Sequence, residues 1–402
     1  MHEQRKMFPL SRRAKMGGLT LIELLVATTI GLIITIAVGT VFLSGNSGAR
    51  RQAQLSLLQQ SVRTAFDYLA RDARMVGHLG CNTGSAATTF TNLITPTDIT
   101  NNYAIGVEGY DYLTAGNAYT LTSNAPVNST TVSNWATNVA SAGVNTLPLT
   151  TLIGSASGDG LTPGSDVLLI RTISGTPVRL TADTVAGSSA LAIENSASGG
   201  LCSDGTTAKV SGFCPITSGI SGSHGLIASC TRAQTFSVNS IAGNTLTISG
   251  ALSATAYPAA TTEVFPMQTV AYYVKRSSSG TTTSLYRRIF DGDHVNGMEQ
   301  ELIEGVEMLQ VRYGVDTTTP DADGVIDGQY IAANAVADWN RVVAIRMGLL
   351  LRAPNPLDSD ITASTAGIPL NGITVTPPNT GRSFDRRVFT TTVAVRNRIS
   401  YL

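Results

Sequence analysis

Hydrophobic residues follow three patterns along the chain, and each pattern predicts a different structure. An almost unbroken apolar run extends from Leu19 to Leu43. Next comes a segment, Leu55 to Val76, in which apolar residues recur every three or four positions. From Asp166 onward, short β-branched and aromatic runs alternate with turns rich in Gly and Ser. The first two patterns are typical of helices and the third of strands, so the sequence predicts an α+β protein with a long N-terminal helix.

The first apolar run is long enough to cross a bilayer, since a membrane-spanning helix needs about 20 predominantly apolar residues. Basic residues are concentrated before it: Arg5, Lys6, Arg12, Arg13 and Lys15. The positive-inside rule therefore places residues 1–18 in the cytoplasm and the chain after Leu43 outside it. In an ordinary secretory signal a small-residue cleavage site follows the apolar core, whereas here Gly17 and Gly18 precede the core.

The helical pattern continues beyond the predicted membrane span as an amphipathic segment. Its apolar stripe consists of Leu55, Leu58, Val62, Phe66, Leu69, Ala73 and Val76. The charged residues off this stripe are expected on a solvated face: Arg50, Arg51, Arg63, Arg71, Asp72 and Arg74. A continuous helix from Thr20 to Val76 would be roughly 85 Å long at 1.5 Å per residue. The cluster Ser44–Gly48 is a candidate interruption, and Gly77 is a natural stop.

Glu23 is the one formal charge in the apolar run. A carboxylate at the centre of a membrane helix costs roughly 2.5–3.5 kcal/mol on insertion scales. Because Glu23 lies near the start of the run, its side chain has two ways to avoid that cost. It either extends to the nearby interface or pairs with a cation.

The sequence Gly18-Leu19-Thr20-Leu21-Ile22-Glu23-Leu24-Leu25-Val26 resembles the processing site of type IV prepilins and type II secretion pseudopilins. Leu19 stands where those families usually have Phe. The resemblance implies that a membrane peptidase cuts after Gly18 and methylates the new N-terminus at Leu19. It also implies that Glu23 pairs with the N-terminal amine of a neighbouring subunit and sets the register between subunits.

Strand patterns dominate the second half of the chain. The predicted strands are Val167–Ile173, Thr235–Ile241, Thr245–Ser249, Val264–Arg276, Leu285–Phe290, Val306–Val315, Trp339–Arg352 and Arg387–Arg398. Turn signals at Ala242–Asn244 and Ser277–Thr283 predict two hairpins. The region 82–165 predicts short strands in long loops, and the Pro- and Gly-rich stretch Ala353–Gly381 predicts a long loop.

Three C-terminal blocks resemble the PilW family of minor pilins: Gly305–Asp316, Trp339–Arg352 and Arg386–Arg398. The segment Arg74–Cys81 is similar to the helix exit of the same family. The resemblance implies a type IV pilin-like fold, in which a long helix packs on an antiparallel β-rich head with long loops. The expected divisions are a cleaved leader (1–18), a transmembrane half-helix (19–43), an amphipathic half-helix (44–76) and an extracytoplasmic head (77–402).

The four cysteines are Cys81, Cys202, Cys214 and Cys230. An even number in a chain with an export segment favours two disulfides over free thiols, and three connectivities are possible. We favour Cys202–Cys214, which closes a short Gly/Ser loop, together with Cys81–Cys230.

The segment Asp316–Asp327 contains the one candidate metal site. Asp321, Asp323 and Asp327 fit positions of a calcium-binding loop, and Asp316 could fold back to supply a further ligand. Residues other than acids occupy the first and last positions of that loop. The alternative is a polar turn between strands, in which Gly324 supplies the positive φ.

No sequence signal points to an enzyme or to a nucleic-acid-binding protein. The histidines are scattered, and hydrolase, metalloprotease and nucleotide-binding motifs are absent. Acidic pairs such as Glu299/Glu301 and Glu304/Glu307 are interpreted as a solvated edge or helix turn. The net charge is zero, without the clustered basic face that nucleic acid requires.

The expected function is therefore structural. The resemblance implies a single-pass inner-membrane protein with a periplasmic head that reaches the pilus tip. The expected partners are the prepilin peptidase, major and other minor pilins and the pilus assembly machinery, in a process that serves cell motility. The expected role is to prime or cap pilus assembly. The alternatives are a type II secretion pseudopilin and a pilus-tip adhesin.

Overall fold

The structure is a computed structural model that describes residues 20–80, 89–96, 99–137, 149, 160–194, 200–217, 220–221, 223–253, 256–294, 297–318, 324–356, 366–378 and 383–395. The chain forms two compact units, Met1–Leu55 and Ser56–Leu402. The predicted cleavage residues Gly18 and Leu19 lie outside the described residues, as do Cys81, Asp321 and Asp323.

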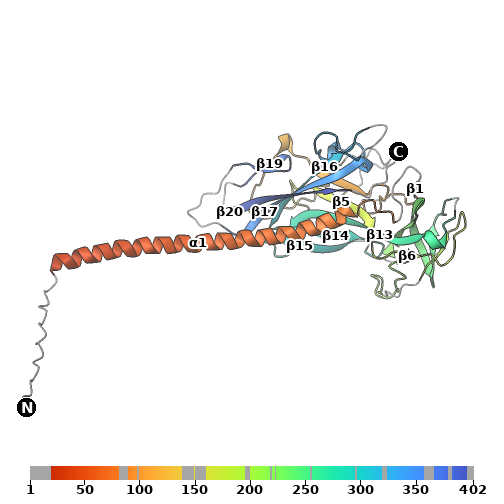
Figure 1. Ribbon diagram of the computed structural model, residues 1–402, viewed down its shortest axis with the longest axis horizontal. Coiled ribbons are helices and arrows are strands. Elements are labelled where there is room, and N and C mark those ends of the chain that lie inside the picture. Colours follow the sequence, from red (N-terminus) through yellow and green to blue (C-terminus); the bar gives the residue numbers. More distant parts are fainter. Residues whose placement is uncertain are drawn as a thin grey trace, which may run out of the picture. The chain divides into compact units, whose positions relative to one another are not determined.

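The N-terminal helix α1 spans Leu21–Arg74 without a break (Figure 1). The cluster Ser44–Gly48 was a candidate interruption, but all five of its residues are helical. The helix ends close to the predicted stop, where Gly77 adopts a φ of 69°. A residue without a Cβ reaches this left-handed conformation at low cost, so Gly77 ends the helix.

The C-terminal part of α1 packs on the head within the second unit. Its buried side chains repeat every three or four residues, as the apolar stripe predicted: Leu58, Val62, Ala65, Leu69, Ala73 and Val76. Leu55 and Phe66 are only half-buried. The prediction of an amphipathic segment is thus confirmed for residues 56–76.

Asp72 was predicted on the solvated face, but that prediction is wrong. Its side chain is buried, and its Oδ2 accepts hydrogen bonds from the Tyr272 hydroxyl at 2.6 Å and from Arg287 Nε at 2.9 Å. Sequence periodicity does not show this, because the two partners lie about 200 residues away on the sheet. Thr172 Oγ1 adds a bond at 3.0 Å to the Met75 carbonyl just beyond the helix. Specific polar contacts therefore fix the helix end on the head.

The head contains a large, mainly antiparallel sheet whose central order is β4-β2-β5-β13-β10-β11-β12-β7. These strands are β4 (Trp135–Ala136), β2 (Val107–Tyr112), β5 (Val167–Ile173), β13 (Glu263–Arg276), β10 (His224–Ser229), β11 (Arg232–Ala242), β12 (Thr245–Ser249) and β7 (Ala190–Ala192). The remaining members of this sheet are β1 (Thr89–Asn92), β6 (Val178–Arg179), β14 (Thr283–Phe290) and β15 (Met298–Glu304). β1 pairs in parallel with β11, which is the exception to the antiparallel pattern.

A second sheet has the order β16-β17-β20 and lies beside the first in the head (Figure 1). Its strands are β16 (Val306–Val315), β17 (Val342–Pro356) and β20 (Phe384–Ala394). Smaller sheets contain β18 (Ile368–Leu370), β19 (Ile373–Thr376) and β3 (Ala118–Thr120), and β8 (Ile216–Thr217) with β9 (Ile220–Ser221). Short 3₁₀ turns lie at Ala115–Asn117, Val132–Asn134, Ala259–Thr261, Ala333–Ala335 and Trp339–Arg341.

Most strand predictions match the structure, and both predicted hairpins are present. β5, β12 and β16 have the predicted bounds. The stretch Ala353–Gly381 is not one long loop, since it includes the end of β17 and the β18–β19 hairpin. This hairpin was missed because its strands are short and one begins next to Pro369. Its parallel partner β3 lies far away in the sequence.

The antiparallel β-rich head thus agrees with the predicted α+β class. Apolar cores lie on separate parts of it. One surrounds β5, β13 and β14 and includes Trp135 and Tyr273. Another lies within the β10–β11–β12 region and includes Phe213 and Phe236.

The Asp72 contacts predict a large effect of one substitution on the stability of the head. Asp72→Ala leaves the Arg287 guanidinium and the Tyr272 hydroxyl without their acceptor. The loss expected for one partner of a buried ion pair is about 3 kcal/mol. Chemical denaturation of the detergent-purified chain measures it. Asp67→Ala, an exposed change on the same helix, should cost less than about 0.5 kcal/mol, and equal losses for the two variants would contradict the assignment.

Candidate functional site

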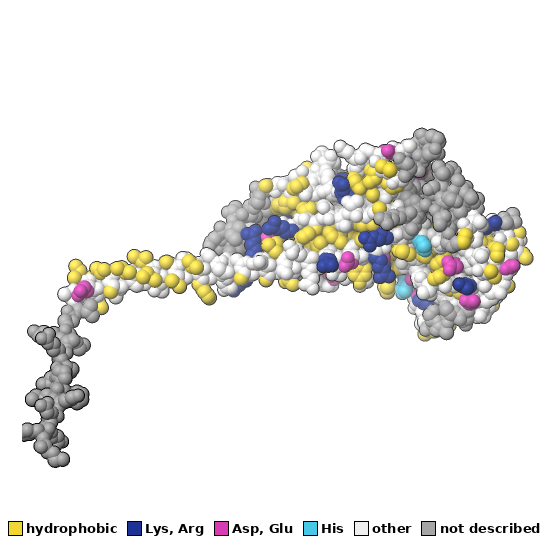
Figure 2. Space-filling model, in the orientation of Figure 1, with side chains coloured by type: hydrophobic (Ala, Val, Ile, Leu, Met, Phe, Trp, Pro, Cys, Tyr) yellow, Lys and Arg dark blue, Asp and Glu magenta, His cyan; other side chains and the backbone are white. Residues whose placement is uncertain are grey.

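The N-terminal half of α1 exposes a continuous apolar surface (Figure 2). Its exposed large side chains are Leu21, Ile22, Leu24, Leu25, Val26, Ile30, Leu32, Ile33, Ile34, Ile36, Val38, Val41, Phe42 and Leu43. A window of this helix has a mean hydropathy of 2.4 and no buried residue, so the helix is long and apolar enough to cross a membrane. Such a surface requires a lipid or protein environment, because exposing it to water is unfavourable.

Glu23 lies at the start of that surface and forms a capping box with Thr20. The Thr20 N–H and hydroxyl both donate to Glu23 Oε2, at 3.0 and 2.9 Å, and the Glu23 N–H donates to Thr20 Oγ1 at 3.3 Å. A capping box satisfies N–H groups that the first turn of a helix leaves free. Glu23 therefore orders the helix start, and its carboxylate is exposed to a further partner.

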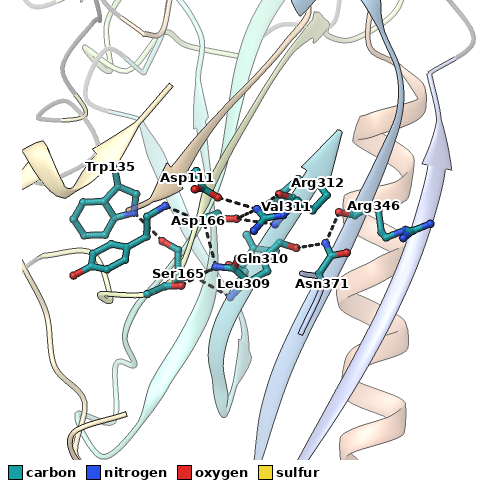
Figure 3. A network of polar contacts seen from close by, with 12 residues as sticks. Asp111, Trp135, Ser165, Asp166, Leu309, Gln310, Val311, Arg312, Arg346 and Asn371 are labelled. Atoms are coloured by element: carbon teal, nitrogen blue, oxygen red, sulfur yellow. Dashed lines mark hydrogen bonds and ion pairs between the residues drawn. The ribbon is translucent and has the colours of Figure 1, made fainter. Parts of the chain in front are cut away.

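No described strand pairs with the outer edge of β16. Side chains close one part of this edge (Figure 3), and the main chain at Ile331 closes another. Asp166 Oδ2 accepts the Val311 N–H at 2.8 Å, and Asp166 N–H donates to the Leu309 carbonyl at 2.8 Å. Ser165 Oγ accepts the Leu309 N–H at 3.0 Å. Farther along, Tyr313 exchanges both of its main-chain hydrogen bonds with Ile331. Asp166 and Ser165 thus supply partners that a neighbouring strand would otherwise provide.

The same carboxylate connects β16 to the large sheet. Asp166 Oδ1 accepts the Tyr112 N–H from β2 at 3.1 Å, and Gln310 Nε2 at 3.1 Å. Arg312 bonds Asp111 at 2.8 Å and lies 3.8 Å from Asp166. Burial raises the pKa of Asp166 well above its usual range, and the N–H donors and Arg312 oppose that effect. Burial likewise raises the pKa of Asp111, against the attraction of Arg312.

This network was not predicted. Gln310 and Arg312 alternate with apolar residues along β16, a pattern typical of a strand with one polar face, but every residue of the strand is buried. Arg312 and Gln310 are buried because β16 lies between β17 and the large sheet. The available sequence signal was three polar residues, Glu307, Gln310 and Arg312, inside an otherwise apolar strand.

The acidic pairs have different environments. Glu299, Glu301 and Glu304 lie on β15, an edge strand, and agree with the predicted solvated edge. Glu307 does not, because it is buried on β16 and Arg386 contacts both of its oxygens, at 2.6 and 3.0 Å. Arg352 lies 3.7 Å from the same carboxylate, so Glu307 joins three neighbouring strands.

The structure contains a disulfide between Cys202 and Cys214, which is the pairing that we favoured. Cys230 is also disulfide-bonded, and its proposed partner Cys81 lies outside the described residues. The Cys202–Cys214 loop is attached to the turn after β14. There Asp293 contacts Lys209 Nζ at 2.5 Å and the Ser203 N–H.

The described part of the calcium candidate forms a hydrogen-bonded turn. Asp316 Oδ2 accepts the Gly324 N–H at 2.7 Å, and Gly324 has the predicted positive φ of 75°. Asp327 Oδ2 accepts the Thr317 N–H at 2.6 Å. Both carboxylates thus stabilise the loop backbone. A second group, Asp291, Asp293 and His294, has ligand atoms close together, but Lys209 already neutralises Asp293.

The hydrogen bonds at the β16 edge predict that two substitutions of Asp166 reduce the stability of the head by different amounts. Asp166→Ala removes the acceptors of two buried N–H groups and should cost about 2–6 kcal/mol, counted as about 1–3 kcal/mol for each unpaired group. Asp166→Asn keeps one acceptor oxygen and should lose less. Chemical denaturation of both variants tests this order. Asparagine as costly as alanine would show that the acceptor oxygens are not what matters.

The contacts of Asp293 predict that its contribution to the stability of the head depends on pH. Burial opposes its ionisation, but the Lys209 ammonium and the Ser203 N–H lower its pKa below the usual range. Its stabilising contribution is therefore complete above the unfolded pKa of about 3.9 and lost as the pH falls through the lower folded value. The destabilisation caused by Asp293→Asn should be present at pH 7 and shrink below about pH 4.

Thermal unfolding of both chains at pH 7 and pH 3 measures the Asp293 effect. Asp67→Asn on the exposed face of α1 is the control, since no partner of its carboxylate is seen among the described contacts. A difference between wild type and Asp293→Asn that does not change with pH would contradict the assignment.

Comparison with known proteins identifies the C-terminal part of the chain. Residues 271–397 match the family model PilW, described as type IV pilus-assembly protein W. Neither the curated proteins nor the solved structures give a significant match. The matched region extends from β13 to just beyond β20 and includes Arg312, Glu307 and the second sheet. This C-terminal part of the chain therefore matches the PilW family of type IV pilus-assembly proteins.

Proposed function

We propose that this protein is a minor pilin that primes or caps a type IV pilus. In this proposal a peptidase removes residues 1–18 and methylates Leu19, and Leu19–Leu43 holds the chain in the inner membrane with its head in the periplasm. The chain then assembles with other minor pilins and with the major pilin at the pilus tip. The PilW-family match supports a role in pilus assembly.

The observation that carries the proposal is the two-part character of α1. One continuous helix exposes an apolar surface in its first half and buries an apolar stripe on the head in its second. The exposed half suits either a bilayer or a bundle of like helices, since both provide an apolar surrounding. A subunit built this way can leave the membrane for a filament without refolding its helix.

Glu23 has a defined part in this mechanism. Its capping box with Thr20 orders the first turn near the proposed N-terminus. The α-amine of Leu19 on a neighbouring subunit would then supply a cation for the carboxylate. Loss of one partner of a buried ion pair costs about 3–5 kcal/mol, so a helix out of register would be disfavoured.

Processing gives the direct test. Gly18→Leu should leave an unprocessed precursor that retains its 18 leader residues and runs more slowly on a gel. The peptidase must bring the backbone at the cut into close contact, and a branched side chain obstructs that approach. Gly17→Leu, next to the cut, is the matched control and should be processed more readily. Normal cleavage of Gly18→Leu would refute the site.

The role in assembly is tested by deleting the chain and counting surface pili. The proposal expects few or no pili and normal export of secreted enzymes. The opposite result, normal pili with impaired enzyme export, would favour a type II secretion pseudopilin. Restoration of pili by the wild-type chain, but not by Gly18→Leu, would connect processing to assembly.

A further inference from the structure

The edge strands of this head differ in how they are protected from pairing with another chain. The edge strand β15 carries Glu299, Glu301 and Glu304, and repeated charges on an edge discourage pairing with another chain. The edge strands β4 and β7 are only 2 and 3 residues long. The outer edge of β16 is closed by Asp166, Ser165 and Ile331.

The part of β20 (Phe384–Ala394) that follows its charged first residues, Val388–Ala394, has none of these protections. The whole strand is 11 residues long, and within the described residues it pairs with β17 on one side and with no strand on the other. Only Asp385 and Val393 are buried along it, and Arg387, Thr390, Thr392 and Ala394 are exposed. The run Val388–Ala394 contains no charge, Pro or Gly. A long, exposed edge of this kind is a template for pairing with a further strand.

The hydrogen-bonding register of β16, β17 and β20 shows which main-chain groups of β20 are available to a further strand. In an antiparallel sheet the residues of a strand alternate between its two neighbours. On β16 the residues Leu309, Val311 and Tyr313 bond outward, so Gln310 and Arg312 bond β17 at Gly348 and Arg346.

It follows that Leu349, Met347 and Ile345 of β17 bond β20 at Phe389, Thr391 and Val393. The main-chain N–H and C=O groups of Val388, Thr390 and Thr392 therefore point away from the sheet. Their spacing, one residue in two, matches the alternation of a partner strand.

We propose that this edge of β20, residues Val388–Ala394, binds an extended strand of a different pilus subunit and lengthens the β16-β17-β20 sheet by one strand. The inference rests on the proposed function for the class of partner. Main-chain hydrogen bonds supply the attraction, and the β-branched side chains of β20 favour an extended partner. The exposed Arg387 at one end selects a partner with a carboxylate opposite it, since its own contact with Asp385 is long, at 3.5 Å.

The test is site-specific photo-crosslinking of the full chain in piliated cells. p-Benzoylphenylalanine at Thr392 should give an adduct with another pilin-like subunit, mapped by mass spectrometry to a predicted strand of that subunit. The same probe at Gln300, on the acidic β15 edge, is the matched control and should give no such adduct. No adduct at Thr392, an adduct with a second copy of this chain, or an adduct with a protein outside the pilus would overturn the proposal.

Two further substitutions test the hydrogen bonds themselves. Thr390→Pro removes an outward N–H and leaves the ladder to β17 intact, so it should abolish the adduct at Thr392. Thr390→Lys keeps the N–H but adds an edge charge, and should also weaken the adduct. Equal thermal midpoints of the purified variants and the wild type show that the head is folded. An undiminished adduct in a folded variant would refute the edge contact.

The two proposals fail in different ways. If deletion of the chain abolishes pili but Thr392 gives no adduct, the strand-pairing inference is wrong and the pilus function stands. If deletion leaves pili unchanged, the proposed function is wrong whatever the adduct shows.

Discussion

Every main-chain N–H and C=O group that is buried in this head needs a hydrogen-bond partner, and that requirement explains why so many charged side chains are inside it. Where a strand ends a sheet in the interior, as β16 does, a neighbouring strand is replaced by side chains. Asp166 fills this position and accepts N–H groups from both β16 and β2. An unpaired buried N–H would cost about 1–3 kcal/mol, and the carboxylate offsets that cost at two places.

A buried carboxylate in turn needs a cation or several donors, and the head meets this need repeatedly. Asp72 is matched by Arg287, Glu108 by Arg171 and Glu307 by Arg386. Such pairs add little net stability compared with apolar residues, but losing one partner is costly. They therefore favour one arrangement of the parts: the helix end on the sheet, β2 paired with β5, and β16 joined to β20 across β17. A subunit that must present fixed surfaces to its neighbours benefits from this specificity.

The requirement for main-chain hydrogen-bond partners also bears on assembly, because the two edges of the second sheet meet it differently. The β16 edge is closed within the chain, whereas no described strand pairs with the outer edge of β20. The exposed half of α1 is a second surface suited to a partner, and it requires an apolar one. The assembly with other pilins that we propose would cover both surfaces. The PilW-family match agrees with such an assembly.

The sequence by itself determined those features that depend on near neighbours. The apolar run and stripe gave α1, the β-branched runs gave β5, β12 and β16, and turn residues gave the hairpin at Gly243. The loop composition also favoured the Cys202–Cys214 disulfide. In each case the signal lies within about 15 residues, where periodicity and turn chemistry act directly.

Only the tertiary structure decided which polar residues are buried and what they bind. Asp72 lies on the polar side of the helical pattern, yet residues 200 positions away make it a buried contact. Arg312 is buried beside Asp111 of β2, and β19 of the unpredicted β18–β19 hairpin pairs with β3, about 250 residues earlier in the chain. The sequence gives the charge of a residue. Whether that charge is removed from water depends on which distant segments pack against it, and therefore on the fold of the whole chain.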